Sequence, residues 1–230
     1  MPQTIGILQP SYLPWLGFFE QIDQVDIFVL YDDVQIEKGS WRNRNRIKGH
    51  DEAIWLTVPV LTKGLGTQLI QDVRIQGNTA WQKKHIKTMT QYYSKAPFFT
   101  HYSVSLFDCI DREWSSLVEL NVTLIKWLCE ELGIQTELIV SSDLKISGKK
   151  SEKIIKTIKS LGGSVFYEGA SGRNYIERSE FDRYGITIQY QDYIHPMYFQ
   201  GKGEFVPYLS IIDLLFNCGS ESLDILRKGK

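Results

Sequence analysis

The sequence predicts an α/β fold of the Rossmann-like type, with a mostly parallel sheet, flanking helices and a helical insertion. Three observations predict it. A strand, a helix and a second strand follow one another at the start of the chain, and the same pattern returns after its middle. Between the two patterns lies a long stretch with helical spacing of its apolar residues.

The first βαβ unit covers about thirty residues. Residues 4–8 form an apolar run that stops at Gln9, and Pro14 stands where the first turn of a helix tolerates proline. We expect the helix over residues 15–24, followed by a second apolar and β-branched run over residues 26–31. The crossover between the two runs predicts that these strands are parallel.

The central part of the chain is expected to be helical. Residues 53–60 and 69–75 first give two further strands, whose pairing could be antiparallel. A mainly helical segment then covers about residues 79–133, and Gly133 ends it. Its three predicted helices span residues 81–94, 98–112 and 115–132.

The second βαβ unit follows this helical segment. Residues 136–140 and 164–167 resemble strands, and residues 149–161 form an amphipathic helix between them. A strand and a final helix complete the chain, at residues 186–190 and 208–217. Because no repeat or low-complexity linker divides the sequence, we expect one α/β domain over residues 1–230.

Composition excludes several classes of protein. The 230 residues are 43% hydrophobic and carry a net charge of −1, which excludes a disordered chain and an overall attraction to nucleic acid or membrane. No apolar run approaches the roughly 18 residues of a membrane-spanning helix, and the N-terminus has no export signal. We therefore expect a cytoplasmic protein without a membrane partner. The three cysteines are expected to be reduced core residues.

The loop after the first strand is a candidate ligand site, because open α/β sheets bind ligands at the carboxyl ends of their strands. Its candidate binding residues are Gln9, Tyr12 and Trp15. The loop has neither a G-x-G-x-x-G nor a Walker pattern, which disfavours an ordinary dinucleotide or kinase-type site. The alternative is a rigid connection braced by its prolines.

A basic segment over residues 41–46 is a second candidate. In extended chain Arg42, Arg44 and Arg46 would share one face, where they would repel unless an anion such as a diphosphate bound to them. Trp41 and Asn43 join them as candidate substrate contacts. The alternative is a solvated basic loop. Asp32, after the second strand, could grip a ribose or a magnesium ion, although we favour neutralisation of the arginines.

Two further turns are candidate phosphate contacts. Lys149 and Ser151 stand at a helix start, where a lysine opposes the helix dipole unless an anion binds. Hydrated lysines beside a capping serine are the alternative. A glycine-rich turn follows the strand at residues 164–167. Its candidate residues are Gly169, Gly172, Arg173 and Tyr175.

Candidate catalytic residues are few. His85, on a helix, and His195, in an aromatic loop, could act as general bases, and a structural role is the alternative for each. Asp213 lies within an apolar helix; if buried and paired, it would orient a basic site residue. The sequence has no G-x-S-x-G elbow and no zinc-binding histidine pair, and we expect no metal site.

Several sequence blocks together resemble the WbqC-like protein family over nearly the whole chain. The blocks are QPSYLPWLGFFE from Gln9, DDVQ from Asp32, KGSWRNRNRI from Lys38, WLTVPV from Trp55 and LSIIDLLFN from Leu209. Proteins of this family are associated with bacterial surface-polysaccharide clusters, including those whose amino sugars carry glycine or another acyl group on nitrogen. The resemblance therefore implies nucleotide-sugar chemistry.

The resemblance and the residues together suggest an N-acyl or aminoacyl (glycyl) transferase acting on a nucleotide-linked amino-dideoxy sugar in O-antigen or capsule biosynthesis. The arginines would hold the diphosphate of a dTDP- or GDP-linked sugar, and His85 or His195 would take a proton from its amine. We expect no tightly bound cofactor. The donor would come from ATP with Mg²⁺ or from an aminoacyl-tRNA.

Two alternatives remain from the sequence. A nucleotidylyltransferase-like enzyme would share the strand, loop and helix layout, but the chain lacks the usual H-x-x-H pair after its first strand. A non-catalytic nucleotide-sugar-binding protein would use the same arginines without turnover. The transferase hypothesis requires the basic clusters to surround one pocket.

Overall fold

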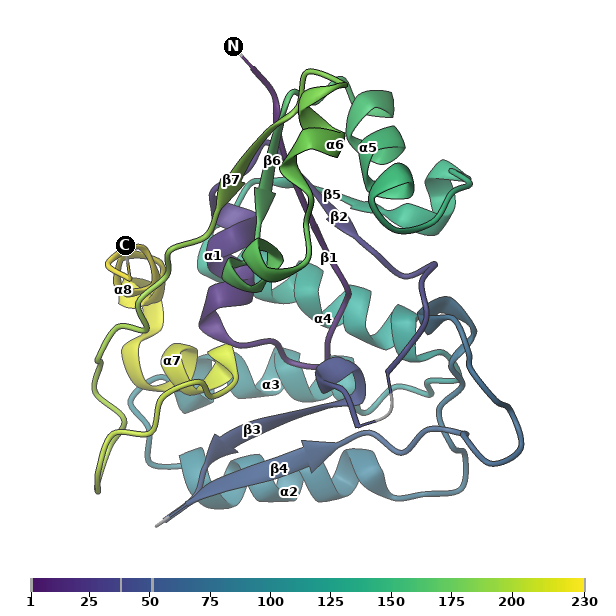
Figure 1. Cartoon of the computed structure of the whole chain (residues 1–230). Helices are drawn as coiled ribbons and strands as arrows, with labels where there is room; N and C mark the ends of the chain where they lie inside the picture. The colour runs from purple at the N-terminus through teal and green to yellow at the C-terminus, as the bar shows by residue number, and fades with distance from the viewer. Residues whose placement is uncertain (1, 38, 51, 230) are drawn as a thin grey trace.

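A five-stranded parallel sheet forms the centre of the fold (Figure 1). The computed structural model describes residues 2–37, 39–50 and 52–229. The strand order is β5-β2-β1-β6-β7, and every neighbouring pair is parallel, which confirms the predicted Rossmann-like fold. The strands are β1 (Thr4–Leu8), β2 (Ile27–Leu30), β5 (Glu137–Val140), β6 (Val165–Glu168) and β7 (Thr187–Tyr190).

The strand order reverses beside β1. From β1 the chain moves outward through β2 to β5, and it then crosses back to place β6 on the other side of β1. The connections that leave β1 and β6 therefore diverge above neighbouring carboxyl ends. Such a switch point opens a crevice in sheets of this type.

Alternate strand residues feed two cores on opposite faces of the sheet, as the period of a strand requires. One core packs against α5 (Lys150–Ser160) and α6 (Arg178–Asp182). Its strand residues include Ile5, Ile7, Ile27, Val29, Phe166 and Ile188. The other, larger core receives Phe28 and Leu30 and contains the buried face of α1 (Leu16–Asp23).

The predicted central helices are present. They are α2 (Trp81–Tyr93), α3 (Phe99–Ile110) and α4 (Leu117–Leu132). The hydroxyl of Ser116 accepts a hydrogen bond from the Glu119 amide and so caps α4, and Gly133 ends it in the left-handed conformation at φ 77°. The final predicted helix is α7 (Ile211–Cys218), and a short α8 (Ser222–Arg227) follows it. We did not predict α6 or α8, because five or six residues carry too little periodicity.

The prediction for residues 53–60 and 69–75 was partly wrong. Residues 69–75 form a 3₁₀ turn (Ile70–Asp72) with isolated bridges, and only β4 (Ala53–Thr57) is a strand. It pairs antiparallel with β3 (Arg44–Lys48) in a separate two-stranded sheet. The other 3₁₀ segments are Trp41–Asn43, Ser141–Leu144, Ala170–Asn174 and Gly219–Glu221.

The loop between β1 and α1 is buried and is held from three directions. The Asn45 side-chain amide donates to the Leu13 carbonyl at 2.7 Å. The Ile211 amide at the start of α7 donates to the Pro14 carbonyl at 2.8 Å. From α4, Asn121 Nδ2 donates to the Pro10 carbonyl at 3.3 Å and to the Arg42 carbonyl at 2.9 Å. The loop therefore joins the antiparallel pair of β3 and β4, called the hairpin below, and the helices α4 and α7 to the parallel sheet.

We predict that Asn121→Ala lowers the free energy of unfolding by about 2 to 3 kcal/mol, because it leaves the buried Pro10 carbonyl without a donor. Urea denaturation followed by circular dichroism measures the change. The exposed Asn174→Ala is the matched control and should change stability by less than about 0.5 kcal/mol. Equal losses in the two variants would contradict this account of the loop.

Candidate functional site

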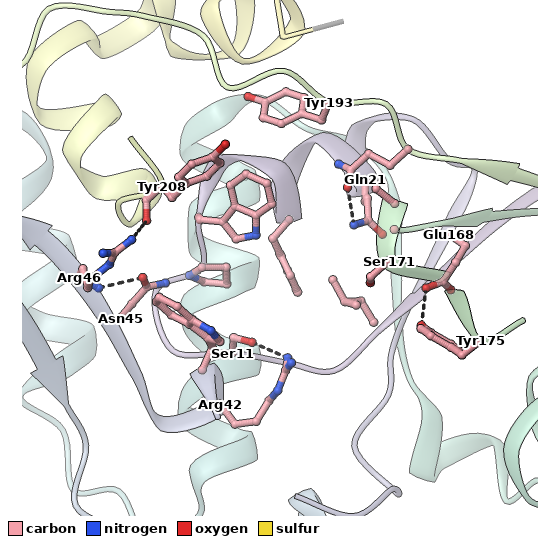
Figure 2. Close-up of a pocket in the computed structure, with 18 residues that line it drawn as sticks. Ser11, Gln21, Arg42, Asn45, Arg46, Glu168, Ser171, Tyr175, Tyr193 and Tyr208 are labelled. Atoms are coloured by element: carbon pink, nitrogen blue, oxygen red, sulfur yellow. Dashed lines mark hydrogen bonds between the residues drawn. The ribbon is translucent and has the colours of Figure 1, made fainter. Parts of the chain in front are cut away.

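A cavity of about 600 Å³ lies at the carboxyl ends of β1 and β6, where the strand order reverses (Figure 2). This volume is within the range of small-molecule sites. Its walls come from the β1–α1 loop and α1, from the segment before β3, from the turn after β6, and from residues after β7. Six predicted site residues line it: Trp15, Trp41, Arg42, Arg46, Gly169 and Tyr175.

Arg42 is a partly buried cation of the cavity wall. Its Nη1 donates to the Gln9 carbonyl and to the Ser11 hydroxyl, both at 2.7 Å, while its buried Nε has no partner among the described residues. Burial lowers the pKa of Arg42 to about 10, and the charge of Glu37 opposes this shift. The guanidinium therefore stays charged at neutral pH, and an anion in the cavity would compensate it.

The three arginines do not share one face, which corrects the prediction of extended chain over residues 41–46. Trp41–Asn43 is a 3₁₀ turn, because the Arg42 carbonyl accepts hydrogen bonds from the Tyr12 amide and from Asn121. Asn43 lies outside the cavity lining and donates to the Val58 carbonyl at 2.8 Å. The turn separates Arg42 from the arginines of β3, of which Arg46 also lines the cavity.

Arg44 and Arg46 lie on the exposed face of the hairpin. The guanidinium of Arg44 lies 4.5 Å from the ring centroid of Trp55, which in turn packs on Trp41 at 5.0 Å. Arg46 lies 5.5 Å from the Trp41 ring and reaches the cavity edge. Among the described residues, none of the three arginines forms an ion pair. Lys38 lies outside the described residues.

Glu168 is the carboxylate of the cavity, and the sequence analysis did not select it. It ends β6, is buried, and accepts a hydrogen bond from the Tyr175 hydroxyl at 3.0 Å. Burial raises the pKa of Glu168 to about 7, although the hydrogen bonds from Tyr175 and the Gly169 amide lower it. A side chain on Gly172 would overlap Glu168, so this predicted glycine leaves room for the carboxylate. A carboxyl group with this pKa can exchange a proton near neutral pH.

A buried amide network lies beside Glu168. Gln191 donates to the Glu20 carboxylate at 2.6 Å and accepts from Gln21 at 3.0 Å. The Tyr167 hydroxyl also donates to Glu20, at 3.0 Å. Gln21 and Gln191 both line the cavity.

An aromatic wall closes another side of the cavity. Trp15 contacts Tyr208 and Tyr193 with centroid distances of 5.7 and 5.8 Å, and all three line the cavity. His195 stacks on Trp15 at 6.5 Å but is not part of the lining, and its Nδ1 lies 2.9 Å from the Pro196 carbonyl. Burial lowers the pKa of His195. Its position supports the indole rather than reaching a ligand.

Tyr12 and His85 lie behind the cavity wall, not in it. The Tyr12 hydroxyl and His85 Nδ1 are 2.9 Å apart, and both side chains are buried. Burial lowers the pKa of His85 to about 4, and a hydrogen bond with the Thr57 backbone opposes this shift. The pair joins α2 to the β1–α1 loop. This is the structural alternative that we considered for His85.

Asp213 occupies a second buried network. Its carboxylate accepts hydrogen bonds from the Tyr93 hydroxyl at 2.7 Å and from the Tyr198 hydroxyl at 2.8 Å. Burial raises its pKa to about 6, although both tyrosines lower it. Tyr93 also accepts from the Lys48 amide at 2.9 Å. Asp213 is therefore buried and paired, and it holds α7 to α2 and β3 without contacting a histidine or lining the cavity.

Asp32 does not neutralise the arginines, which corrects that prediction. Its buried carboxylate accepts from the hydroxyls of Ser141 and Ser142 at 2.9 and 2.8 Å. The neighbouring Asp33 pairs with Lys153 of α5 at 2.6 Å. These contacts join the carboxyl ends of β2 and β5.

The predicted basic clusters do not all reach one cavity. Lys149 and Ser151 lie at the start of α5, which is drawn at the opposite end of the molecule from β3 in Figure 1, and neither lines the cavity. Arg173 lies 5.2 Å from the Tyr190 ring centroid, in a separate shallow pocket. Gly169 and Tyr175 do line the cavity, whereas Arg173, from the same turn, lies outside it. One pocket for all four clusters was therefore a wrong expectation, and the mechanism that required it is withdrawn. Arg42 and Arg46 are the predicted cations that line the cavity, and any chemistry there must be argued from its own lining.

The missed residues had weak signals in the sequence. Glu168 is the single charged residue of an otherwise apolar strand, at its carboxyl end, and Gln21 lies in the largely apolar α1.

In residues 2–37, 39–50 and 52–229, no three His, Cys, Asp or Glu side chains gather as metal ligands. None of the helices in these ranges combines the length and the apolar character that crossing a bilayer needs.

We predict that the stability of the protein falls as pH rises from 4.5 to 7, relative to Glu168→Gln. The folded pKa of Glu168 lies above its ordinary 4.5, so the folded state binds the proton more tightly, and the stabilisation is lost as pH rises through about 7. The difference should be on the order of 3 kcal/mol, measured by denaturation at several pH values. The exposed Glu180→Gln should follow the wild type. Parallel curves for wild type and Glu168→Gln would contradict the buried carboxyl.

Comparisons with known proteins agree with the resemblance of the sequence blocks. The chain is 37% identical over 227 residues to "Uncharacterized protein Rv1507c" from Mycobacterium tuberculosis (strain ATCC 25618 / H37Rv), and the match covers 98% of each chain. No solved structure matches the chain significantly. The model of the WbqC-like protein family matches residues 9–225. The chain therefore belongs to the WbqC-like protein family.

Proposed function

We propose that the protein transfers an acyl or aminoacyl group, such as glycyl, to the amine of a nucleotide-linked amino-dideoxy sugar in O-antigen or capsule biosynthesis. One observation carries the reaction class: a buried carboxyl group, Glu168, has a pKa of about 7 in the wall of the cavity at the switch point. Amide formation needs a base for the amine proton, and a base of this pKa suits neutral pH.

The cavity offers groups for each part of such a substrate. The Arg42 guanidinium forms no ion pair with a carboxylate of the described residues, and it suits a diphosphate. The rings of Trp15 and Tyr208 offer apolar faces for a nucleobase. In Figure 2, Glu168 lies on the opposite side of the cavity from Arg46. The sugar amine would bind beside Glu168, away from the nucleobase.

In the proposed step, the amine nitrogen attacks the carbonyl carbon of an activated acyl group and a C–N bond forms. The bond to the leaving oxygen then breaks, and that oxygen keeps the electron pair. Glu168 accepts the proton that the amine loses, while Tyr175 orients the carboxylate through its 3.0 Å hydrogen bond. This role replaces the one considered for His85 and His195, neither of which lines the cavity.

The leaving oxygen belongs to the donor. With an acyl adenylate, made from ATP with Mg²⁺, it is a phosphate oxygen; with an aminoacyl-tRNA it is a ribose oxygen. The described lining residues include no histidine, so the nucleotidylyltransferase-like alternative gains no support from them.

We expect the wild-type protein to add a glycyl mass to a dTDP-linked 4-amino-4,6-dideoxy sugar, with the product detected by mass spectrometry. One reaction contains glycine and ATP with Mg²⁺, and a second contains glycyl-tRNA. Glu168→Gln should lower the rate about 100-fold or more, because it cannot accept the proton. Glu180→Gln is the matched control and should keep the wild-type rate.

Two outcomes would contradict the proposed reaction. Absence of the added mass with both donors and with dTDP- and GDP-linked acceptors would reject the transferase. Full activity of Glu168→Gln would reject Glu168 as the base. Nucleotide-sugar binding without any product would instead support the non-catalytic alternative.

We predict that Arg42→Lys raises the KM for the nucleotide sugar about 10-fold or more and changes kcat less, because lysine cannot reproduce the guanidinium geometry. Steady-state kinetics with varied nucleotide sugar measures both constants. Arg44→Lys is the matched control, since Arg44 lies on the exposed face of the hairpin and does not line the cavity. Equal effects of the two substitutions would contradict the role of Arg42.

A further inference from the structure

Gln21 lines the cavity and carries a buried hydrogen-bond acceptor that has no partner among the described residues. It lies on α1 among apolar residues, is 4% exposed, and lines the cavity. Its Oε1 is buried and has no hydrogen-bond partner among the described residues. A buried polar atom without a partner costs about 1 to 3 kcal/mol, so its presence beside a cavity requires a reason.

The network around Gln21 fixes which of its side-chain atoms is the acceptor. Gln191 Nε2 donates to the Gly17 carbonyl at 2.8 Å and to Glu20 Oε2 at 2.6 Å. Rotating this amide would place its oxygen against two other acceptors. Gln191 Oε1 must therefore accept, and it does so from Gln21 Nε2 at 3.0 Å. The oxygen of Gln21 is left over as a consequence of the network.

Gln21 and Glu168 lie in the same part of the cavity. Figure 2 shows both on the side away from Arg46 and Asn45. Gly169, which follows Glu168, comes so close to Gln21 that an added Cβ would lie 3.4 Å from Gln21 Nε2. The Glu168 carboxylate and Gln21 Oε1 are both acceptors, whereas Arg42 brings donors to another part of the cavity.

We propose that Gln21 Oε1 and the Glu168 carboxylate form a subsite for a primary amine, which binds as an ammonium group or as an N–H donor. An ammonium group has three donors and no acceptor, so it complements Gln21 Oε1 and the ionised Glu168 carboxylate, which are both acceptors. The inference rests on the proposed function in assigning the amine to an amino sugar. It deepens that function by making Gln21 a residue that selects amines over the corresponding deoxy compounds.

The test is a thermodynamic cycle that compares two proteins, with and without the Gln21 amide, and two ligands, with and without the amine. The ligands are methyl 4-amino-4,6-dideoxyglucoside and methyl 4,6-dideoxyglucoside, which has hydrogen at C4, and the two corresponding dTDP sugars. Calorimetry gives Kd values for the wild type and for Gln21→Met, which keeps the side-chain length. Any loss of stability or of the Gln191 contact affects both ligands and cancels in the ratio.

We expect the wild type to bind the amine about 10-fold or more tightly than the deoxy ligand, and Gln21→Met to reduce this ratio to about 3-fold or less. Gln21→Glu is the second variant, for the case that Gln21→Met fails to fold. When its buried carboxyl is protonated, the O–H can replace Nε2 as the donor to Gln191, the other oxygen remains an acceptor, and the preference should be retained. The exposed Gln91→Met should leave the ratio unchanged. No amine preference in the wild type, or the same preference in Gln21→Met, would overturn the subsite.

Failure of this inference is distinguishable from failure of the proposed function. A Gln21-dependent amine preference without acyl transfer supports the subsite and rejects the transferase. Acyl transfer by a protein whose amine preference is the same in Gln21→Met as in the wild type supports the transferase and rejects the subsite. The methyl glycosides keep the test valid if the nucleotide is not recognised.

Discussion

The buried loop between β1 and α1 constrains the rest of the structure. Its peptide groups lie away from water, so each must find a partner within the protein. Asn45 of the hairpin, Asn121 of α4 and the first amide of α7 supply these partners. Three elements distant in sequence thereby meet at the carboxyl end of β1. The cavity exists because the loop that forms one of its walls is fixed from behind.

The same anchoring explains why Arg42 differs from its neighbours. Its carbonyl accepts hydrogen bonds from the Tyr12 amide of the loop and from Asn121. These bonds hold the turn before β3, from which the Arg42 guanidinium reaches Gln9 and Ser11. Arg44 and Arg46 follow after the turn and pack on exposed indoles. One hydrogen-bonded turn thus gives Arg42 different contacts from Arg44 and Arg46, although Arg46 also reaches the cavity.

The buried polar groups of this fold divide into two kinds. The pair of Tyr12 and His85 and the two tyrosines on Asp213 use local partners to join helices and the hairpin. Arg42 Nε and Gln21 Oε1 have no hydrogen-bond partner among the described residues, and burial raises the pKa of Glu168. A complementary ligand would compensate such groups. Asn121 Oδ1 and Trp127 Nε1 also lack a partner among those residues but lie outside the cavity lining, so the position of Arg42, Gln21 and Glu168 in the lining marks the candidate site.

The sequence by itself determined the five strands of the parallel sheet, though not their order, and most helices, because apolar periodicity, proline and glycine act over short distances. It also identified the loop after β1, Arg42 and the turn after β6 as site elements. Only the tertiary structure decided that Glu168 and Gln21 face the cavity, that His85 and Asp213 do not, and that Lys149 and Arg173 lie elsewhere. These outcomes depend on burial and on hydrogen bonds between residues far apart in the chain, which local patterns do not encode.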